Sequence, residues 1–79
     1  MKPERVFRIG SISASVFANE ADGEGGKRQM RNVNLQRRYR DGDQWKSSTS
    51  FALADLPAAM AVLKLALDHV AAQEAVIQP

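Results

Sequence analysis

The chain contains no cysteine, and His69 is the only histidine among its 79 residues. The lack of cysteine excludes disulfides and thiolate metal ligands. A zinc site would need carboxylates for most of its ligands, which is uncommon. No nucleophile and base form a recognisable constellation, and catalysis requires positioned partners. We therefore expect no enzyme activity, no metal, no cofactor and no small-molecule substrate, and we interpret His69 as a helix-surface or interface residue.

Long hydrophobic runs are also missing. The first ten residues lack the apolar segment of a signal peptide. No stretch approaches the roughly 20 apolar residues that span a membrane. The most apolar stretch, residues 52–67, is interrupted by Asp55, Pro57 and Lys64. These absences predict a cytoplasmic protein with no membrane partner.

The short length predicts one domain, residues 1–79. Domains of this size often gain stability from disulfides, metals or oligomerisation. The composition disfavours the first two, so oligomerisation is the route left open.

Acidic residues are unevenly distributed along the chain. Residues 1–46 contain ten Lys or Arg and six Asp or Glu, whereas residues 47–79 contain one Lys and three acids. A basic half of this kind favours a polyanionic partner. An ordinary solvated surface explains the charge alone equally well.

The first half of the chain has the two-residue periodicity of β-strands. Residues 5–18 are the first predicted strand. Phe7 and Ile9 have the opposite parity to Ile12, so we predict a bulge or bend at Gly10 that returns them to the buried side. Residues 19–26, with three glycines and three acids, are predicted to form a mobile loop.

Two further strands, about residues 27–40 and 44–53, flank the hairpin signal Asp41-Gly42-Asp43. A three-residue loop pairs Tyr39 with Trp45. A two-residue Asp41-Gly42 loop instead mixes apolar and polar residues on each face. Because a one-residue slip turns a strand inside out, the hydrophobic pattern favours the three-residue loop or a bulge beside it.

Residues 56–73 are predicted to form a helix, with Asp55 as its N-cap and Pro57 in its first turn. The helix is apolar over most of its circumference and needs cover on more than one side. One side can rest on the sheet, and the same helix of a second chain can cover the other. The predicted homodimer interface consists of Met60, Leu63, Leu67 and Val70.

These elements predict an α+β fold. A curved antiparallel sheet of three strands, or four if the first is split at Gly10, is covered on one face by a C-terminal helix, in the order β-β-β-α or β-β-β-β-α.

The predicted open face of the sheet follows from alternation. Apart from Met30, its residues are basic, amide-bearing, small or aromatic, and none is acidic: Ser11, Ser13, Ser15, Phe17, Arg28, Met30, Asn32, Asn34, Gln36, Arg38, Arg40, Lys46, Ser48 and Ser50. Sheets that combine basic charge with stacking groups commonly hold single-stranded nucleic acid. Tyr39 and Trp45 are also candidate stacking groups, although they have the parity of the core.

Arg37 has the parity of the core side. We expect its aliphatic stem to pack at the edge of the core while its guanidinium group reaches water. The alternative is a salt bridge between the guanidinium group and an acid of the helix or of a loop.

The strand-strand-strand-helix order, the stretch "LQRRYRDGDQWKSSTSFALADL" that runs into a helix, and the apolar helix together resemble single-stranded nucleic-acid-binding domains of the Pur-alpha, Whirly and positive-cofactor-four (PC4) type. The resemblance is architectural and covers nearly the whole chain. It implies a dimer that binds nucleic acid through its sheet. The stretch "RRYRDGDQWKSSTSF" also resembles small uncharacterised bacterial proteins, which implies no activity.

The leading hypothesis is therefore a homodimer that binds single-stranded DNA or RNA with low sequence specificity, in transcription or nucleic-acid processing. Phosphates would contact basic residues, bases or sugars would contact amides, and a base would stack on Phe17; the predicted binding residues are Phe17, Arg28, Asn32, Asn34, Gln36, Arg38, Arg40 and Lys46. The alternative is a small structural or protein-interaction domain with no nucleic-acid ligand.

Overall fold

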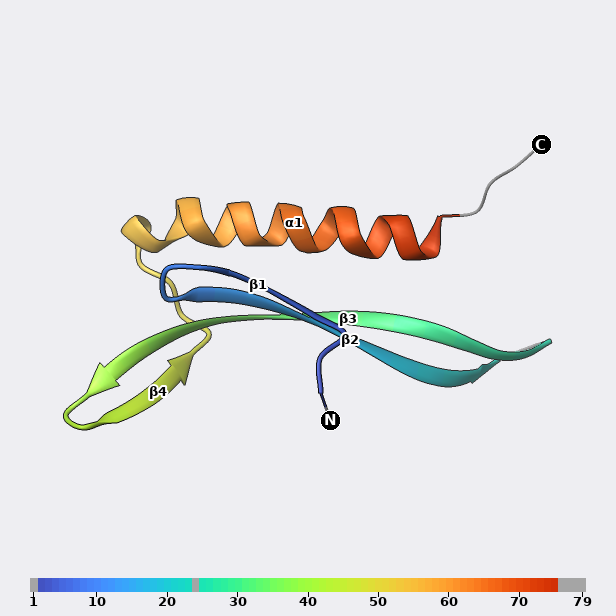
Figure 1. Ribbon diagram of the computed structural model, residues 1–79, viewed down its shortest axis with the longest axis horizontal. Coiled ribbons are helices and arrows are strands. Elements are labelled where there is room, and N and C mark those ends of the chain that lie inside the picture. The colour runs from blue at the N-terminus through green and yellow to red at the C-terminus, as the bar shows by residue number, and fades with distance from the viewer. Residues whose placement is uncertain (1, 24, 76–79) are drawn as a thin grey trace.

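The computed structural model describes residues 2–23 and 25–75, apart from the side chains of Ala21, Lys27 and Arg28. Its elements are β1 (Arg5–Ile9), β2 (Ile12–Gly23), β3 (Gly26–Asp41), β4 (Gln44–Ser48), a 3₁₀ turn (Leu53–Asp55) and α1 (Leu56–Glu74). The four strands form one antiparallel sheet in the order β1-β2-β3-β4, and α1 packs against one face (Figure 1). The predicted α+β fold is confirmed in its four-stranded form. Within the described residues, no helix has the length and apolar character needed to cross a membrane.

A tight turn at Gly10 and Ser11 separates β1 from β2. Gly10 has a φ of 59°, which fits the first central position of a type II′ hairpin turn. Ile9 consequently pairs with Ile12, and Phe7 pairs with Ala14. The predicted bend is confirmed, and it brings Phe7 and Ile9 to the helix side, where Ile12 and Ala14 lie.

The predicted mobile loop at residues 19–26 is wrong. β2 continues to Gly23, β3 begins at Gly26, and the two strands stay paired over this whole length. Pairing of antiparallel strands uses backbone groups that every non-proline residue carries, so a polar composition does not prevent it. The far end of this hairpin extends beyond the helix in Figure 1.

The predicted register of the last hairpin is also wrong. Asp41 pairs with Gln44 and Arg40 pairs with Trp45, so the loop consists of Gly42 and Asp43. Gly42 has a φ of 64°, which again fits the first central position of a type II′ turn. This hairpin bends away from α1 (Figure 1), and none of residues 39–48 belongs to the hydrophobic core, so burial does not set its register. β4 ends at Ser48, several residues before the predicted limit at Leu53.

The core lies between α1 and the central part of the sheet. Among the described residues, the fully buried hydrophobic side chains are Ile12, Ala14 and Val16 of β2 and Ala59, Val62 and Ala66 of α1. Half of these are alanines, so the helix approaches the sheet closely but buries little volume. Partly buried neighbours complete the core: Phe7, Leu35, Phe51, Ala58 and Val70.

The molecule is elongated, with extents of 52 × 26 × 16 Å and a radius of gyration of 15.4 Å. A compact chain of this length has a radius of gyration of about 12 Å. The accessible surface is 6143 Å², whereas a compact monomer of this mass exposes about 4,700 Å². The excess of about 1,400 Å² indicates that a single copy leaves an unusual share of its surface in water.

A polar cluster joins the start of the chain to β3 and α1. The Arg31 guanidinium donates from Nε and Nη2 to the two oxygens of Glu4 at 2.9 and 3.0 Å, and only 9% of its side chain is exposed. His69 Nε2 lies 2.7 Å from Glu4 Oε2. The hydrogen bond from Arg31, followed by that with His69, lowers the pKa of Glu4 from 4.5 to about 2.

Arg37 lies on the helix side, as predicted, and its Nε donates to the carbonyl oxygen of Ser50 at 3.2 Å. The same nitrogen lies 3.5 Å from Asp55 Oδ2, which confirms the expected salt bridge with an acid. Asp55 is the N-cap residue of α1, but its carboxylate accepts a hydrogen bond from the backbone N–H of Ala52 rather than from the first turn of the helix. Pro57 lies in that first turn, as predicted.

Truncating the centre of the small core should destabilise the protein. We expect Val62→Ala to lower the free energy of unfolding by about 2 kcal/mol, because it removes two buried methyl groups and leaves a cavity. Urea unfolding followed by circular dichroism at a fixed protein concentration measures the change. Leu53 is 84% exposed, and Leu53→Ala, as the control, should change stability by less than about 0.5 kcal/mol. Equal effects of the two substitutions would contradict this description of the core.

Acid should weaken the protein through the polar cluster. Because the pKa of Glu4 is about 2 in the folded chain and 4.5 as its ordinary value, its stabilisation is complete above pH 4.5 and is lost as the pH falls toward 2. We expect Glu4→Gln to be less stable at neutral pH and to lose less stability over that interval. Urea unfolding at several pH values tests this, with Asp68→Asn, in the exposed pair with Lys64, as the control. A Glu4→Gln variant with the acid sensitivity of the unmodified protein would refute it.

Candidate functional site

A row of exposed polar side chains follows β3 on the face of the sheet opposite α1. β3 pairs with β2 so that Val33 and Leu35 share the helix side with Val16 and Ala14. The alternate residues of β3 therefore occupy the open face, and from residue 32 onward they form an unbroken row of five exposed polar side chains: Asn32, Asn34, Gln36, Arg38 and Arg40. Their exposure satisfies the first requirement of a binding surface.

The neighbouring strands complete this open face. β1 contributes Val6 and Arg8, which pair with Ser15 and Ser13 of β2. Ser13 is buried between its neighbours and is not available to a ligand. Arg8 is not among the binding residues predicted from the sequence, although the bend predicted at Gly10 implies its position on the open face.

The described part of the structure does not show three of the predicted binding residues as exposed residues of the open face. Lys46 pairs with Tyr39 and lies on the helix side of the sheet, where its Nζ forms an ion pair with Asp41 at 2.7 Å. Its predicted place on the open face is wrong, as is that of Ser48, which pairs with Arg37. Phe17 is on the open face but half-buried. The side chain of Arg28 lies outside the described part of the structure.

The same change of register moves Trp45 onto the open face. Trp45 is 57% exposed, and its indole packs against two guanidinium groups rather than against the core. The Cζ atom of Arg38 lies 4.8 Å from the ring centre, and that of Arg40 lies 5.6 Å from it. Sequence reasoning missed this position, and the signal that could have found it is Gly42 followed by Asp43, a two-residue turn with glycine first.

The charge of the open face is uncompensated. No acidic residue lies on this face among the described strand residues, and Asp43 lies in the turn at its end. Arg8 and Arg38 form no hydrogen bond or ion pair through their side chains within the described residues, and Arg40 donates only to the carbonyl oxygen of Gly42 at 3.4 Å. These guanidinium groups therefore keep donors available for an anion.

The shape of the sheet suits an elongated ligand. β3 curves away from α1 toward both ends, most strongly at the β3–β4 hairpin (Figure 1), so the open face is concave along the strand. Alternate residues of a strand repeat about every 7 Å, and the row from Asn32 to Arg40 therefore spans about 27 Å.

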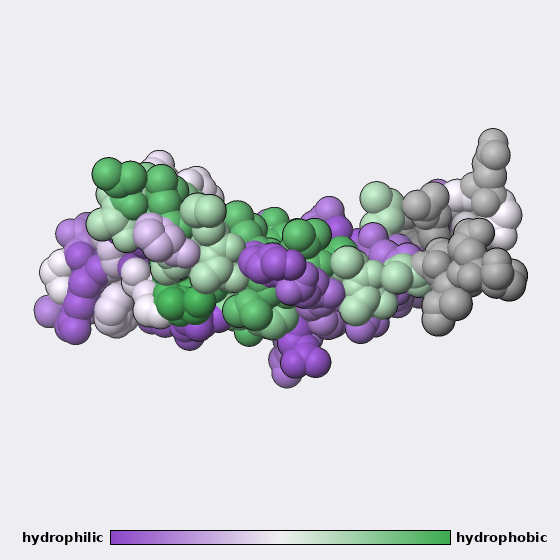
Figure 2. Space-filling model, turned by 90° about the horizontal axis from the view of Figure 1, so that it is seen from above, coloured by the Kyte–Doolittle hydropathy of each residue, from purple (hydrophilic) through white to green (hydrophobic). Residues whose placement is uncertain are grey.

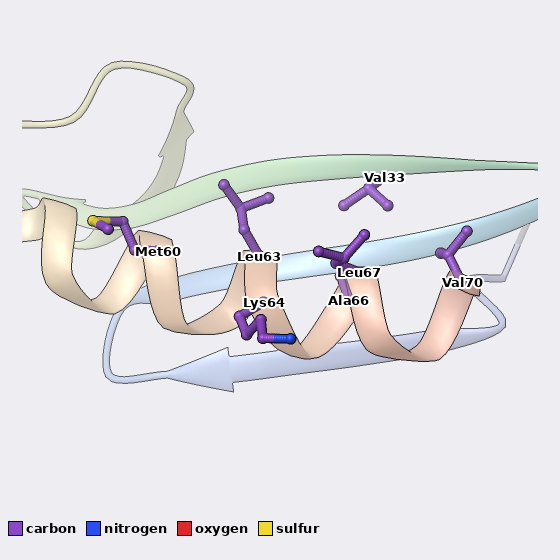
Figure 3. A pocket seen from close by; sticks show the side chains of 7 residues that line it. All are labelled: Val33, Met60, Leu63, Lys64, Ala66, Leu67 and Val70. Carbon is purple, nitrogen blue, oxygen red and sulfur yellow. The ribbon is translucent and has the colours of Figure 1, made fainter. Parts of the chain in front are cut away.

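The helix side carries a second, apolar surface. α1 lies mainly over β1 and β2, and a trough of about 540 Å³ remains between α1 and β3. Figure 3 shows Leu63, Leu67 and Val70 of α1 extending toward the side of β3 that carries Val33. The trough contains all four predicted dimer-interface residues; its lining is Val33, Met60, Leu63, Lys64, Ala66, Leu67 and Val70.

This apolar surface is largely exposed. Met60 is 70% exposed and Leu67 is 60% exposed. Figure 2 shows hydrophobic residues gathered on the side of the molecule that carries α1. Contiguous apolar patches of this kind mark contacts with other molecules.

Neither surface has the donor set of a metal site, since no group of three or more His, Cys, Asp or Glu side chains comes together within the described residues. The site is thus a polar, basic sheet face with one exposed indole. Comparison of the chain with protein-family models, curated proteins and solved structures finds no match.

Proposed function

We propose that the protein is a homodimer that binds single-stranded DNA or RNA on the open face of its sheet, with little sequence preference. The observation that carries this proposal is the continuous exposed row from Asn32 to Arg40, basic at one end and without acid among the described residues. A solvated sheet face ordinarily mixes both signs of charge. Under this proposal the chain uses its sheet as Pur-alpha, Whirly and PC4 domains do.

The basic and the amide side chains of the open face contact different parts of the nucleic acid. Arg38, Arg40 and Arg8 bind phosphates, because guanidinium groups match the geometry of phosphate oxygens. Asn32, Asn34 and Gln36 contact bases or sugars. These are the same three amide residues that the sequence predicts for this role. Amides both donate and accept hydrogen bonds, so they can satisfy the edges of different bases. Low sequence specificity follows from this versatility.

Dimerisation through the apolar trough accounts for the exposed helix residues. A second copy of α1 placed over Met60, Leu63, Leu67 and Val70 would cover them. A stable interface buries about 800 Å² per partner, and the excess surface of the single chain is of that order. Since the trough and the open face lie on opposite sides of the sheet, dimerisation leaves the binding face accessible.

A second candidate function is favoured by the same trough. An exposed apolar helix surface also suits a protein-interaction domain without a nucleic-acid ligand. This alternative requires no affinity for oligonucleotides, so titration with nucleic acid separates the two functions.

Binding should depend strongly on salt. We expect a fluorescein-labelled oligothymidylate of roughly 20 nucleotides, a length that covers typical single-strand sites, to bind at low salt with micromolar or better affinity. Three phosphate contacts per protomer give a slope of about −2 per protomer in a plot of log affinity against log salt. Such a slope corresponds to a roughly twentyfold loss of affinity between about 50 and 200 mM salt. Fluorescence anisotropy measures both quantities. No binding at micromolar protein in low salt would exclude the proposed function and favour the protein-interaction domain.

The open face should account for this binding. Replacing Arg38 and Arg40 together by Gln should lower affinity by at least tenfold and reduce the magnitude of the salt slope by about 1.4 per protomer. Lys46→Gln is the matched control, because Lys46 is adjacent to Trp45 in sequence but lies on the helix side. It should change affinity less than about twofold, since a screened charge on the far face contributes little. A larger effect of Lys46→Gln than of the double substitution would refute the assignment of faces.

The dimer should be sensitive to charge in the trough. We expect Leu67→Glu to weaken self-association by at least about thirtyfold, because it places an unpaired carboxylate in a desolvated apolar contact. Sedimentation equilibrium measures the dissociation constant. Leu53→Glu is the control, since Leu53 is exposed and lies outside the trough. A monomeric unmodified protein at high micromolar concentration, or an unchanged dimer in Leu67→Glu, would contradict the proposed interface.

A further inference from the structure

A hollow of about 320 Å³ lies where the β1–β2 turn meets β3 and β4 on the open face. It is lined by Gly10, Ser11, Arg38 and Trp45. The backbone N–H of Arg38 donates to the carbonyl oxygen of Ser11 at 2.8 Å, which fixes the turn against β3. A Cβ added at Gly10 would meet no atom within 4 Å, so this side of the hollow is open. Its volume is at the lower end of the roughly 300–1,000 Å³ of small-ligand pockets, which suits one planar ring system.

Trp45 gives this hollow an aromatic wall. It is the only tryptophan in the chain, and more than half of its surface is exposed. A large side chain of this type ordinarily contributes to a core or an interface. The hairpin register instead places the indole on the open face, beside the end of the polar row.

Arg38 adds a cation to the same wall. Its guanidinium lies over the indole at 4.8 Å from the ring centre, and its side chain has no hydrogen bond or ion pair in the part of the chain that the structure describes. Bases of single-stranded nucleic acid are held by stacking on aromatic rings or guanidinium planes, next to cations that bind the flanking phosphates. The hollow thus combines a stacking surface with phosphate donors.

We propose that this hollow is a stacking subsite for one unstacked nucleobase, with Trp45 as the stacking side chain and Arg38 and Arg40 as ligands of the adjacent phosphates. This proposal rests on the proposed function and names the residue that anchors the strand. A nucleic acid lying along β3 from Asn32 reaches the hollow at the basic end of the row. The hydroxyl of Ser11, which has no hydrogen bond within the described residues, can donate to or accept from the edge of the base. A purine should bind here better than a pyrimidine, because its two rings cover more of the indole.

The single tryptophan allows the subsite to be observed directly. We expect unlabelled oligodeoxyadenylate of roughly 20 nucleotides to quench the emission of Trp45 as it binds. Trp45→Leu should lower the affinity measured by anisotropy about tenfold, since one stacked base contributes about that much, and Trp45→Phe should restore most of it. Tyr39→Leu is the matched control, because Tyr39 carries an equivalent arginine contact, with Arg37 at 5.2 Å, on the helix side. It should bind within about twofold of the unmodified protein.

An abasic oligomer of the same length separates stacking from charge, because it keeps the phosphates and lacks the bases. With this abasic ligand, Trp45→Leu should bind as tightly as the unmodified protein. If Trp45→Leu binds oligodeoxyadenylate as tightly as the unmodified protein, while the Arg38 and Arg40 double substitution weakens binding, the subsite is wrong and the proposed function stands. If Trp45→Leu weakens the abasic and normal oligomers equally, the indole acts by supporting the hairpin, and the subsite is again wrong. If the unmodified protein binds neither oligomer at low salt, both proposals fail.

Discussion

Two glycine-led turns hold the strands of this sheet in register, and the register determines which face each side chain occupies. Gly10 and Gly42 both have positive φ at the first central position of a two-residue turn. Because side chains alternate along a strand, a shift of one residue at either turn would exchange the two faces of β1 or β4. The open face depends on this constraint: the turns bring Arg8 from one edge strand and Trp45 from the other to the side of Arg38.

The sequence correctly predicts those elements whose apolar residues must face the core, because burial there requires a regular spacing of apolar residues. Alternation in β2 and the apolar periodicity of α1 indicate the correct elements, and the parity of Phe7 and Ile9 correctly requires a bend at Gly10. The prediction fails where the sheet leaves the core. Residues 19–23 extend a two-stranded ribbon with residues 26–30, and the backbone pairing that forms it is not revealed by composition.

The β3–β4 hairpin shows the same limit at the candidate site. Pairing of Tyr39 with Trp45 would place both aromatic residues on the side of a core. No core lies beneath this hairpin, so the geometry of the turn at Gly42 and Asp43 decides the register. The row from Asn32 to Arg40 could be predicted, because β3 is anchored over the core at Val33 and Leu35. The faces of Lys46 and Trp45 follow only from the turn, so they can be predicted only if Gly42 and Asp43 are recognised as the two-residue loop.

Ion pairing explains how a chain with a net charge of only +2 has a strongly polarised sheet. The ion pairs seen among the described residues lie on the helix side or along the helix: Glu4 with Arg31, Asp55 with Arg37, Asp41 with Lys46 and Asp68 with Lys64. Each pair neutralises a basic residue that does not face the open side, whereas Arg8, Arg38 and Arg40 on the open face form no ion pair within the described residues. Under the proposed function, the field of these cations across a concave surface would attract an anionic strand more strongly than the net charge alone indicates. The small core has a related consequence: α1 covers β1 and β2 but leaves β3 partly bare on the helix side, so each face of β3 is available to a different partner.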